Sequence, residues 1–373
     1  MKTSTHALVF ATALMTLTAA LTGCADSEDS TTPVGDVGGE SDEFVEALPN
    51  DEMLSMSMSS DEVITSEQGL STVEQGLQPA GLRQHTEDLL RGINGLRQST
   101  QEAIELLTSS VEPVTLTQAN TTCKRWEADG ERASWQLTSC LKNRQAKHYG
   151  YILRGRALDS TSDDDYVAVF AGEGFVLPRH EGRRRGRGVA LYDFNNLAAL
   201  TGASAQGQLG IGYRAAGQMR QLNIGLKEVA GANAEQPLSA AYRFTHAIGR
   251  GGSFRYLTRH DVLAVGENGL EEGQDGVLEL ARAHVAWSTR GAARAAVAFC
   301  GGSVGERCIF ARQCWEANGP VTFSEVVDRD SDAQWEPTSC AEVFEPVDVP
   351  SEDDVALDGD DATMAIPEPG ADE

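Results

Sequence analysis

The sequence lacks basic residues over two long stretches. Residues 25–80 contain 14 Asp or Glu and residues 341–373 contain 12, and neither stretch has a Lys or Arg. These 26 acids account for the whole formal charge of −26 of the 373-residue chain. Residues 81–340 are close to neutral, with 30 acids against 29 bases. This distribution excludes a generally basic chain that binds nucleic acid, and we expect no nucleic-acid partner.

The sequence also lacks long apolar runs beyond its N-terminus. The one apolar run, residues 7–20, follows a charged start at Lys2 and spans 14 residues, which is too short for a comfortable membrane span. The lack of a second run excludes a polytopic membrane protein. The short N-terminal run has the form of a secretory signal, so the chain is predicted to be exported.

Several catalytic signatures are missing as well. The sequence has no Walker phosphate loop, no His-Glu-x-x-His zinc motif and no Cys-x-x-Cys pair, and we expect no Gly-x-Ser-x-Gly nucleophile elbow. We therefore predict that the protein is not an enzyme. A hydrolase whose active site is assembled from scattered residues stays open as an alternative.

The residues at the end of the apolar run form a candidate sorting signal. Leu21-Thr22-Gly23-Cys24 follows the run, and with the charged start it resembles the lipobox of bacterial lipoproteins. The resemblance covers residues 1–24 only. It implies that residues 1–23 are a cleaved signal peptide, that Cys24 carries the lipid anchor, and that the membrane is a partner through this anchor. Ala25 in place of Asp favours the outer membrane if the host is Gram-negative.

The two acidic stretches predict unstructured segments. Residues 24–80 and 341–373 are rich in Asp and Glu and poor in aromatic residues, and such segments bury too little apolar surface to offset the entropy of ordering. We expect 24–80 to be a disordered tether that lifts the domain off the membrane, and 341–373 to be a disordered tail. Residues 81–340 then form a single folded domain.

The periodicity of this domain predicts a β-rich α+β fold. Apolar positions recur at helical spacing from Leu82 to Leu107, which predicts an amphipathic helix. We expect it to pack on a sheet, with a coiled-coil dimer as the alternative. After Pro113 the pattern has period two, which predicts a curved antiparallel meander of about ten strands with a short helix at 195–200. The predicted strands are 133–142, 149–158, 166–170, 188–194, 208–215, 219–229, 238–247, 254–262, 277–289, 292–300 and 308–315.

A repeated pattern predicts three disulfides. Cys123 precedes a Trp-Glu-Ala-Asp-Gly stretch and a Trp-x-x-Thr-Ser-Cys stretch that ends at Cys140; Cys314 precedes nearly the same two stretches, and the second ends at Cys340. Asp-Gly and Asn-Gly form hairpin turns, so each copy is predicted to be a hairpin closed by its own disulfide. Cys300 and Cys308 flank a short loop and are expected to pair. An exported location favours these bonds.

One basic cluster is a candidate anion site. Guanidinium groups match phosphates well, and in an envelope protein the natural anions are lipid or lipopolysaccharide phosphates. Pairing with the protein's own acidic stretches, or with residues 163–165, is the alternative. The cluster, in a predicted loop between strands, consists of Arg179, Arg183, Arg184, Arg185 and Arg187.

Two groups of residues are candidate metal sites. Asp328, Asp330 and Asp332 alternate like calcium-loop ligands. Residues 333 and 339 lack the Gly and the Glu that such a loop needs, so a solvated loop is the alternative and no cofactor is expected. Three histidines lie on successive predicted strands and could share zinc, although polar positions on an exposed face are the simpler interpretation. They are His246, His260 and His284.

These observations predict an exported, lipid-anchored envelope protein that acts as a non-catalytic structural or interaction module. Its partner is an envelope protein or lipid of unknown identity. The first alternative is a carrier that encloses an apolar ligand or lipid between the helix and the curved sheet. This plan looks like that of periplasmic lipid-carrier half-barrels, an analogy of architecture alone.

Overall fold

The computed structural model describes residues 40–58, 82–118, 121–180, 182–216, 218–230, 237–260, 262–266, 269–272, 277–289, 292–304, 308–316 and 321–328. All of these residues fall within one unit, Val37–Ile366. The predicted signal peptide, Cys24 and the tail 341–373 lie outside the described residues.

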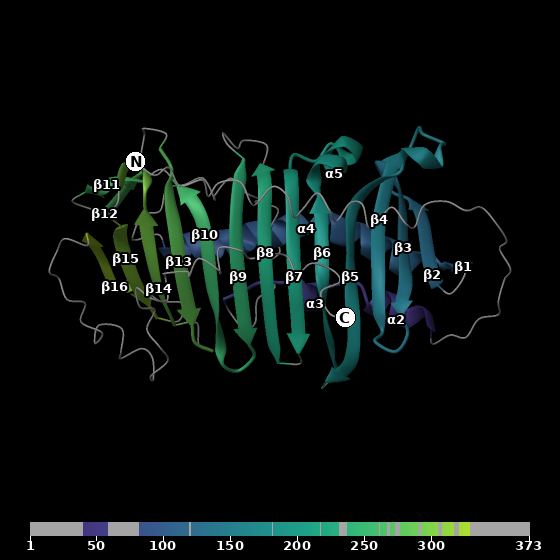
Figure 1. Cartoon of the computed structure of the whole chain (residues 1–373), viewed down its shortest axis with the longest axis horizontal. Coiled ribbons are helices and arrows are strands. Elements are labelled where there is room, and N and C mark those ends of the chain that lie inside the picture. The colour runs from purple at the N-terminus through teal and green to yellow at the C-terminus, as the bar shows by residue number, and fades with distance from the viewer. Residues whose placement is uncertain are drawn as a thin grey trace, which may run out of the picture. The chain divides into compact units, whose positions relative to one another are not determined.

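Fourteen strands form one antiparallel sheet, and their spatial order follows the chain (Figure 1). A separate hairpin, β11 (Val262–Gly266) with β12 (Gly269–Glu272), is inserted between β10 and β13. The prediction of a mainly antiparallel meander is confirmed, whereas about ten strands is too low a number. The large sheet consists of β1 (Val114–Gln118), β2 (Thr121–Asp129), β3 (Ala133–Asn143), β4 (His148–Ala157), β5 (Val167–His180), β6 (Arg183–Asp193), β7 (Gln206–Ala216), β8 (Met219–Ala230), β9 (Leu238–Ala247), β10 (Gly251–His260), β13 (Glu279–Trp287), β14 (Ala293–Cys300), β15 (Cys308–Trp315) and β16 (Val321–Asp328).

The predicted amphipathic helix is present as α4 (Leu82–Ser110). It crosses one face of the sheet, behind the strands in Figure 1, and shares a hydrophobic core with them. No helix in the described segments is long and apolar enough to span a membrane. All eight positions of the predicted apolar stripe are buried, namely Leu82, Thr86, Leu89, Ile93, Leu96, Thr100, Ala103 and Leu107.

The predicted short helix is α5 (Phe194–Thr201), which connects β6 and β7. The Asp193 carboxylate accepts a hydrogen bond from the Asn196 backbone N–H at 3.0 Å and caps the first turn. Gly202 ends the helix in the left-handed conformation, with φ at 72°.

The prediction of a disordered tether over 24–80 is wrong for residues 40–58, which we name the strap. The strap contains α2 (Glu40–Glu46) and α3 (Asp51–Leu54). Its apolar side chains join the core formed by α4 and the sheet. Acidic composition misleads here because a few apolar residues, once they have a preformed surface to pack on, can order a short segment. The buried ones are Phe44, Ala47, Leu48, Met53, Leu54 and Met56.

Two predicted disulfides are confirmed. Cys123–Cys140 and Cys300–Cys308 each join residues that are directly paired, across β2–β3 and β14–β15. Cys314 on β15 is also disulfide-bonded. Its predicted partner, Cys340, lies outside the described residues, so this third pairing stays a prediction.

Candidate functional site

Strand register divides the side chains of the sheet between two faces. One row of cross-strand neighbours leads to Gly174 on β5, where an added Cβ would lie 2.7 Å from the carbonyl oxygen of Ala47 in the strap. The face that contains this row is therefore the inner face, which the strap and α4 cover. The intervening residues form the outer face, because successive side chains alternate. The row contains Gly174, Gly188, Tyr213, Leu222, Phe244 and Phe254.

Glycines on β5 and β6 give the strap its place on the inner face. A Cβ at Gly186 would lie 3.4 Å from Cε of Met53, and one at Gly174 would crowd Ala47. Without side chains at these positions, the strap backbone can approach the sheet closely. The alternating glycines at 172, 174, 186 and 188 are the sequence signal for this approach.

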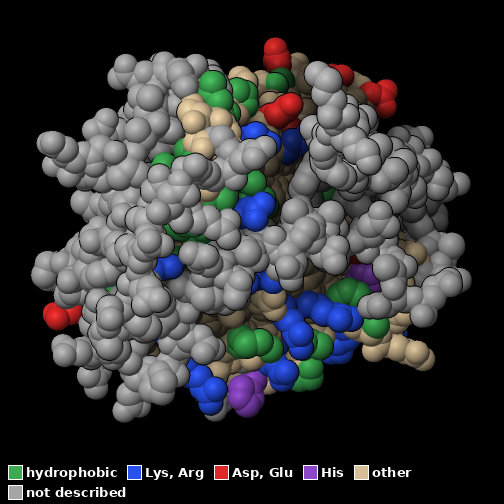
Figure 2. All heavy atoms as spheres, turned by 60° about the vertical axis from the view of Figure 1, so that its left-hand side comes forward, with side chains coloured by type: hydrophobic (Ala, Val, Ile, Leu, Met, Phe, Trp, Pro, Cys, Tyr) green, Lys and Arg blue, Asp and Glu red, His purple; other side chains and the backbone are tan. Residues whose placement is uncertain are grey.

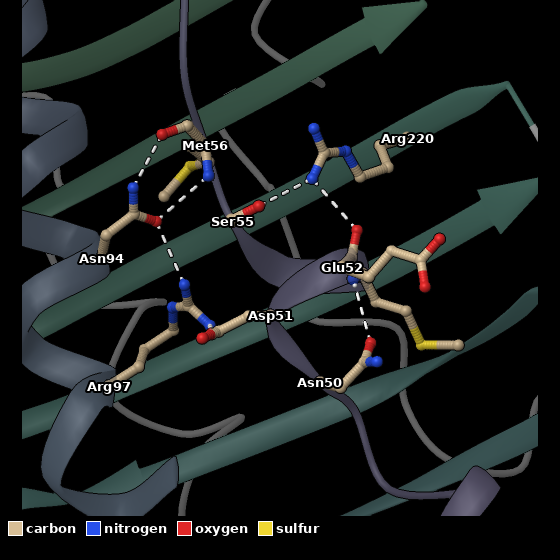
Figure 3. A network of polar contacts seen from close by, with 9 residues as sticks. Asn50, Asp51, Glu52, Ser55, Met56, Asn94, Arg97 and Arg220 are labelled. Atoms are coloured by element: carbon tan, nitrogen blue, oxygen red, sulfur yellow. Dashed lines mark hydrogen bonds and ion pairs between the residues drawn. The ribbon is translucent and has the colours of Figure 1, made fainter. Parts of the chain in front are cut away.

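A buried amide on α4 holds the end of the strap (Figure 3). Oδ1 of Asn94 accepts a hydrogen bond from the Met56 backbone N–H at 3.1 Å, and Nδ2 donates to the Met56 carbonyl at 2.7 Å. The side chain thus satisfies both backbone groups of one strap residue. Because Asn94 is buried, losing this pair would leave polar groups without water.

Two arginines complete the network. Arg97 is only 2% exposed; it donates to Oδ1 of Asn94 at 3.1 Å and lies 3.4 Å from the Asp51 carboxylate. Arg220 on β8 donates to the Glu52 carbonyl at 3.0 Å and to Oγ of Ser55 at 2.8 Å (Figure 3). Burial lowers the pKa of the Arg220 guanidinium. These contacts join α4, the sheet and the strap.

The other end of the strap is held by carboxylates on α2. Nζ of Lys147 donates to Glu43 at 2.7 Å and the Tyr149 hydroxyl donates at 3.0 Å. The hydrogen bond from Lys147 and the weaker effect of Tyr149 hold the pKa of Glu43 below its usual value, against the opposing effect of burial. Glu46 pairs with Arg179 at 2.5 Å.

The outer face from β7 to β15 carries mainly cations. In the described strands its outward residues include one carboxylate, the exposed Glu228, which lies in the bulge of β8 between Lys227 and the buried Val229. In Figure 2 basic side chains gather over the lower part of the face shown, and the visible acidic side chains lie near its margins. We name this surface the arginine face. It comprises Arg214, Lys227, Arg243, Arg255, Arg259, Arg282, Arg294 and Arg312, with His284 among them; Arg294 and His284 are buried.

Like charges are paired directly across strands on the arginine face. Arg243 on β9 is the register partner of Arg255 on β10, which is in turn the partner of His284 on β13. Arg214 on β7 is likewise paired with Arg187 on β6. Directly opposed like charges destabilise a sheet, so the arrangement favours an anion that bridges the guanidinium groups.

The predicted basic cluster is a strand hairpin and not a loop. Its arginines lie at the ends of β5 and β6, where His180 pairs with Arg183. Arg179 pairs with Glu46 of the acidic stretch, as the alternative interpretation expected. Residues 163–165 do not serve this cluster in the described contacts, since Asp163 pairs with Arg156 at 3.1 Å. Arg187 lies over the Phe175 ring at 4.8 Å and continues the arginine face.

The three histidines do not converge. His246 is paired with Gly252, which shares the inner face with Phe254, whereas His284 is paired with Arg255 on the outer face. Burial lowers the pKa of His246, with a contribution from Arg220. Within the described segments no group of three or more His, Cys, Asp or Glu could hold a metal ion. Asp330 and Asp332 of the predicted calcium loop lie outside the described residues, and Asp328 is the last residue of β16.

The β14–β15 loop contains a serine motif with the spacing of a catalytic one. Gly301, Ser303 and Gly305 have the Gly-x-Ser-x-Gly spacing of hydrolase elbows, which need a strand followed by a helix. Here the described part of the connection is a 3-10 turn, Gly302–Val304, between two antiparallel strands, and the Ser303 backbone N–H donates to the buried Glu279 at 2.6 Å. The loop therefore does not fit a nucleophile elbow.

No family model matches the chain, and no curated protein or solved structure matches it.

Proposed function

We propose that the chain is an exported, lipid-anchored envelope protein that acts as a non-catalytic interaction module, with the arginine face as its binding surface. The observation that carries the proposal is a sheet face with eight cations and a single carboxylate, Glu228, at its described outward positions. The opposite face is already occupied by α4 and the strap. The arginine face is thus the face of the sheet opposite α4 and the strap, and its net charge is positive.

Phosphate groups of anionic envelope lipids suit this surface best. Guanidinium groups bind phosphate oxygens in a bidentate manner, and directly paired side chains on adjacent strands lie about 5 Å apart. Neighbouring phosphates of a lipid surface can bridge such pairs. Nucleic acid is not proposed, because the lipobox directs the chain to the envelope.

The anchor keeps the domain near such a surface. Only residues 25–39 separate Cys24 from the first residue of α2. Fifteen residues at the maximal reach of ~3.5 Å each extend to at most about 55 Å. A lipid on Cys24 would therefore tie the strap, and with it the sheet, close to the membrane.

Vesicle binding tests the proposal. Residues 24–373 with Cys24→Ser, exported through an ordinary cleavable signal, are mixed with phosphatidylcholine vesicles with or without phosphatidylglycerol. We expect binding only to the anionic vesicles, weakening as salt rises. Arg243→Gln with Arg255→Gln should reduce affinity at least about tenfold. Arg125→Gln with Arg156→Gln, which removes two cations already paired with Glu127 and Asp163, is the matched control. Equal losses in both double variants would contradict the proposal.

A carrier is the second candidate, because polar atoms are buried on the inner face. Trp287 and Trp315 have no partner for the indole N–H, and neither amide atom of Gln313 has one, in the part of the chain that the structure describes. Each unpaired buried group costs about 1–3 kcal/mol, which an enclosed ligand with acceptor oxygens would offset. Native mass spectrometry of the exported chain tests this: a co-purifying lipid-sized mass supports a carrier, and a bare mass removes it.

A further inference from the structure

The arginine face and the C-terminal tail have complementary charge. Residues 341–373 contain 12 Asp or Glu and no Lys or Arg. The arginine face carries eight cations against one outward carboxylate in its described strands, Glu228, so its net charge is strongly positive. From these observations and the geometry below, we propose that the acidic tail 341–373 docks on the arginine face as an intramolecular ligand. The inference rests on the proposed function in one respect, namely that this face is a binding surface.

The predicted third disulfide would place the start of the tail on the outer face. Cys314 is disulfide-bonded and lies on the outer face, directly paired with Arg294. The other four described cysteines pair with each other, which leaves Cys24 and Cys340 as partners. Because the lipobox assigns Cys24 to lipid, Cys340 is the remaining partner. A Cys314–Cys340 bond would start the tail between Arg294 and Arg312.

The length of the tail matches the arginine face. From β15 to β7 the sheet has six strand intervals, which at ~4.8 Å each span about 29 Å. The 33 residues of 341–373 as a flexible chain have a root-mean-square span of about 30 Å. The tail can therefore reach the whole face from its starting point without strain.

Docking of the tail would regulate the binding of external anions to the arginine face. A tethered ligand has an effective concentration of about a millimolar, so the tail competes with any external anion. At physiological salt, charges more than about 8 Å apart are screened, so the competition depends on direct contact between carboxylates and guanidinium groups. A dense anionic surface displaces the tail, whereas dilute phosphate does not.

The test compares three forms of residues 24–373, all with Cys24→Ser. In the first form the tail is native. In the second the 12 tail acids are changed to Asn or Gln. The control form neutralises the eight acids of residues 25–39 and 59–80. Binding to vesicles of phosphatidylcholine with phosphatidylglycerol is measured at low salt. We expect about tenfold tighter binding for the neutralised tail than for both other forms. A tail-neutral form that binds like the native form overturns the inference.

A peptide of residues 341–373 separates this inference from the proposed function. We expect the peptide to bind the tail-neutral form. We expect this binding to be lost when that form also carries Arg243→Gln and Arg255→Gln. If no form binds vesicles but the peptide binds, the lipid partner is wrong and tail docking stands. If all forms bind vesicles equally and the peptide does not bind, the lipid-binding face stands and tail docking is wrong.

Discussion

Asn94 shows how one residue can organise a fold whose composition suggests disorder. Its amide pairs with both backbone groups of Met56, and its Oδ1 also accepts from Arg97. An amide is suited to this position because it carries a donor and an acceptor side by side. A buried polar side chain beside the apolar stripe of α4 is unfavourable by itself, so its partners in the strap explain its presence.

Replacing Asn94 should loosen the strap. In Asn94→Ala the Met56 N–H and carbonyl lose their partners, and we expect a loss of about 1–3 kcal/mol in the free energy of unfolding. Gln98→Ala on the same helix removes only an exposed hydrogen bond to Glu102 and should change stability by less than about 0.5 kcal/mol. Urea unfolding of both variants measures this, and similar losses would contradict the role of Asn94.

Glu43 should make strap attachment dependent on pH. Its folded-state pKa is lowered from the ordinary 4.5, chiefly by Lys147. Its contribution to stability is therefore present above about pH 4.5 and is lost as pH falls through the lowered folded-state pKa. We expect the stability difference between wild type and Glu43→Gln to be largest at pH 6 and to shrink below pH 4.5. A stability difference that stays constant from pH 6 to pH 3 would contradict a lowered folded-state pKa of Glu43. Glu105→Gln on α4, an exposed position, is the control.

At the residue scale the sequence reveals part of the arginine face. Arg255 alternates with the buried Phe254 and Tyr256, and this alternation alone predicts that it points outward. Its pairing with Arg243 depends on cross-strand register, which a single sequence does not specify. The cluster that the sequence did indicate, around Arg183, is local in the chain, whereas the arginine face is assembled from separate strands.

At the scale of elements, periodic segments were predictable and the strap was not. The helix at 82–110 and strand 238–247 have strong periodicity, and α5 has an Asp cap that marks its start. The strap has only four-residue and seven-residue helices, too short for a periodic signal. Its order comes from packing on a surface that its own sequence does not contain.

A glycine substitution on β5 should displace the strap without changing its sequence. In Gly174→Val the new side chain would meet the Ala47 carbonyl at 2.7 Å, so we expect a loss of about 1–3 kcal/mol. Gly225→Val on β8 is the matched control, because nothing lies within 4 Å of an added Cβ there. Proteolysis between residues 40 and 58, followed by mass spectrometry, should be faster only in Gly174→Val. Equal proteolysis in the two variants would contradict the claim that the lack of a side chain at Gly174 lets the strap pack on the sheet.

At the scale of the whole molecule, the strap shortens the spacer between the proposed lipid anchor and the domain. A disordered 24–80 would have set the sheet far from the membrane, whereas ordering of residues 40–58 leaves only 15 residues of spacer. The acidic stretch is thus in part a structural element, and its carboxylates at Glu43 and Glu46 pair with basic residues of the sheet. Charge runs in a sequence do not distinguish a spacer from a segment that binds its own domain.

The anchor and the third disulfide make a joint prediction about the whole chain. Cys314 is disulfide-bonded, and a Cys24 that carries lipid cannot be its partner. We therefore expect Cys24→Ser to lose labelled-palmitate incorporation and to expose no free thiol. Cys340→Ser should keep the label and expose a single thiol, at Cys314, detectable by alkylation under denaturing conditions. A free thiol in Cys24→Ser, or none in Cys340→Ser, would mean that Cys24 pairs with Cys314. In that case the lipid anchor, and the nearness to membrane phosphates that depends on it, would be lost together.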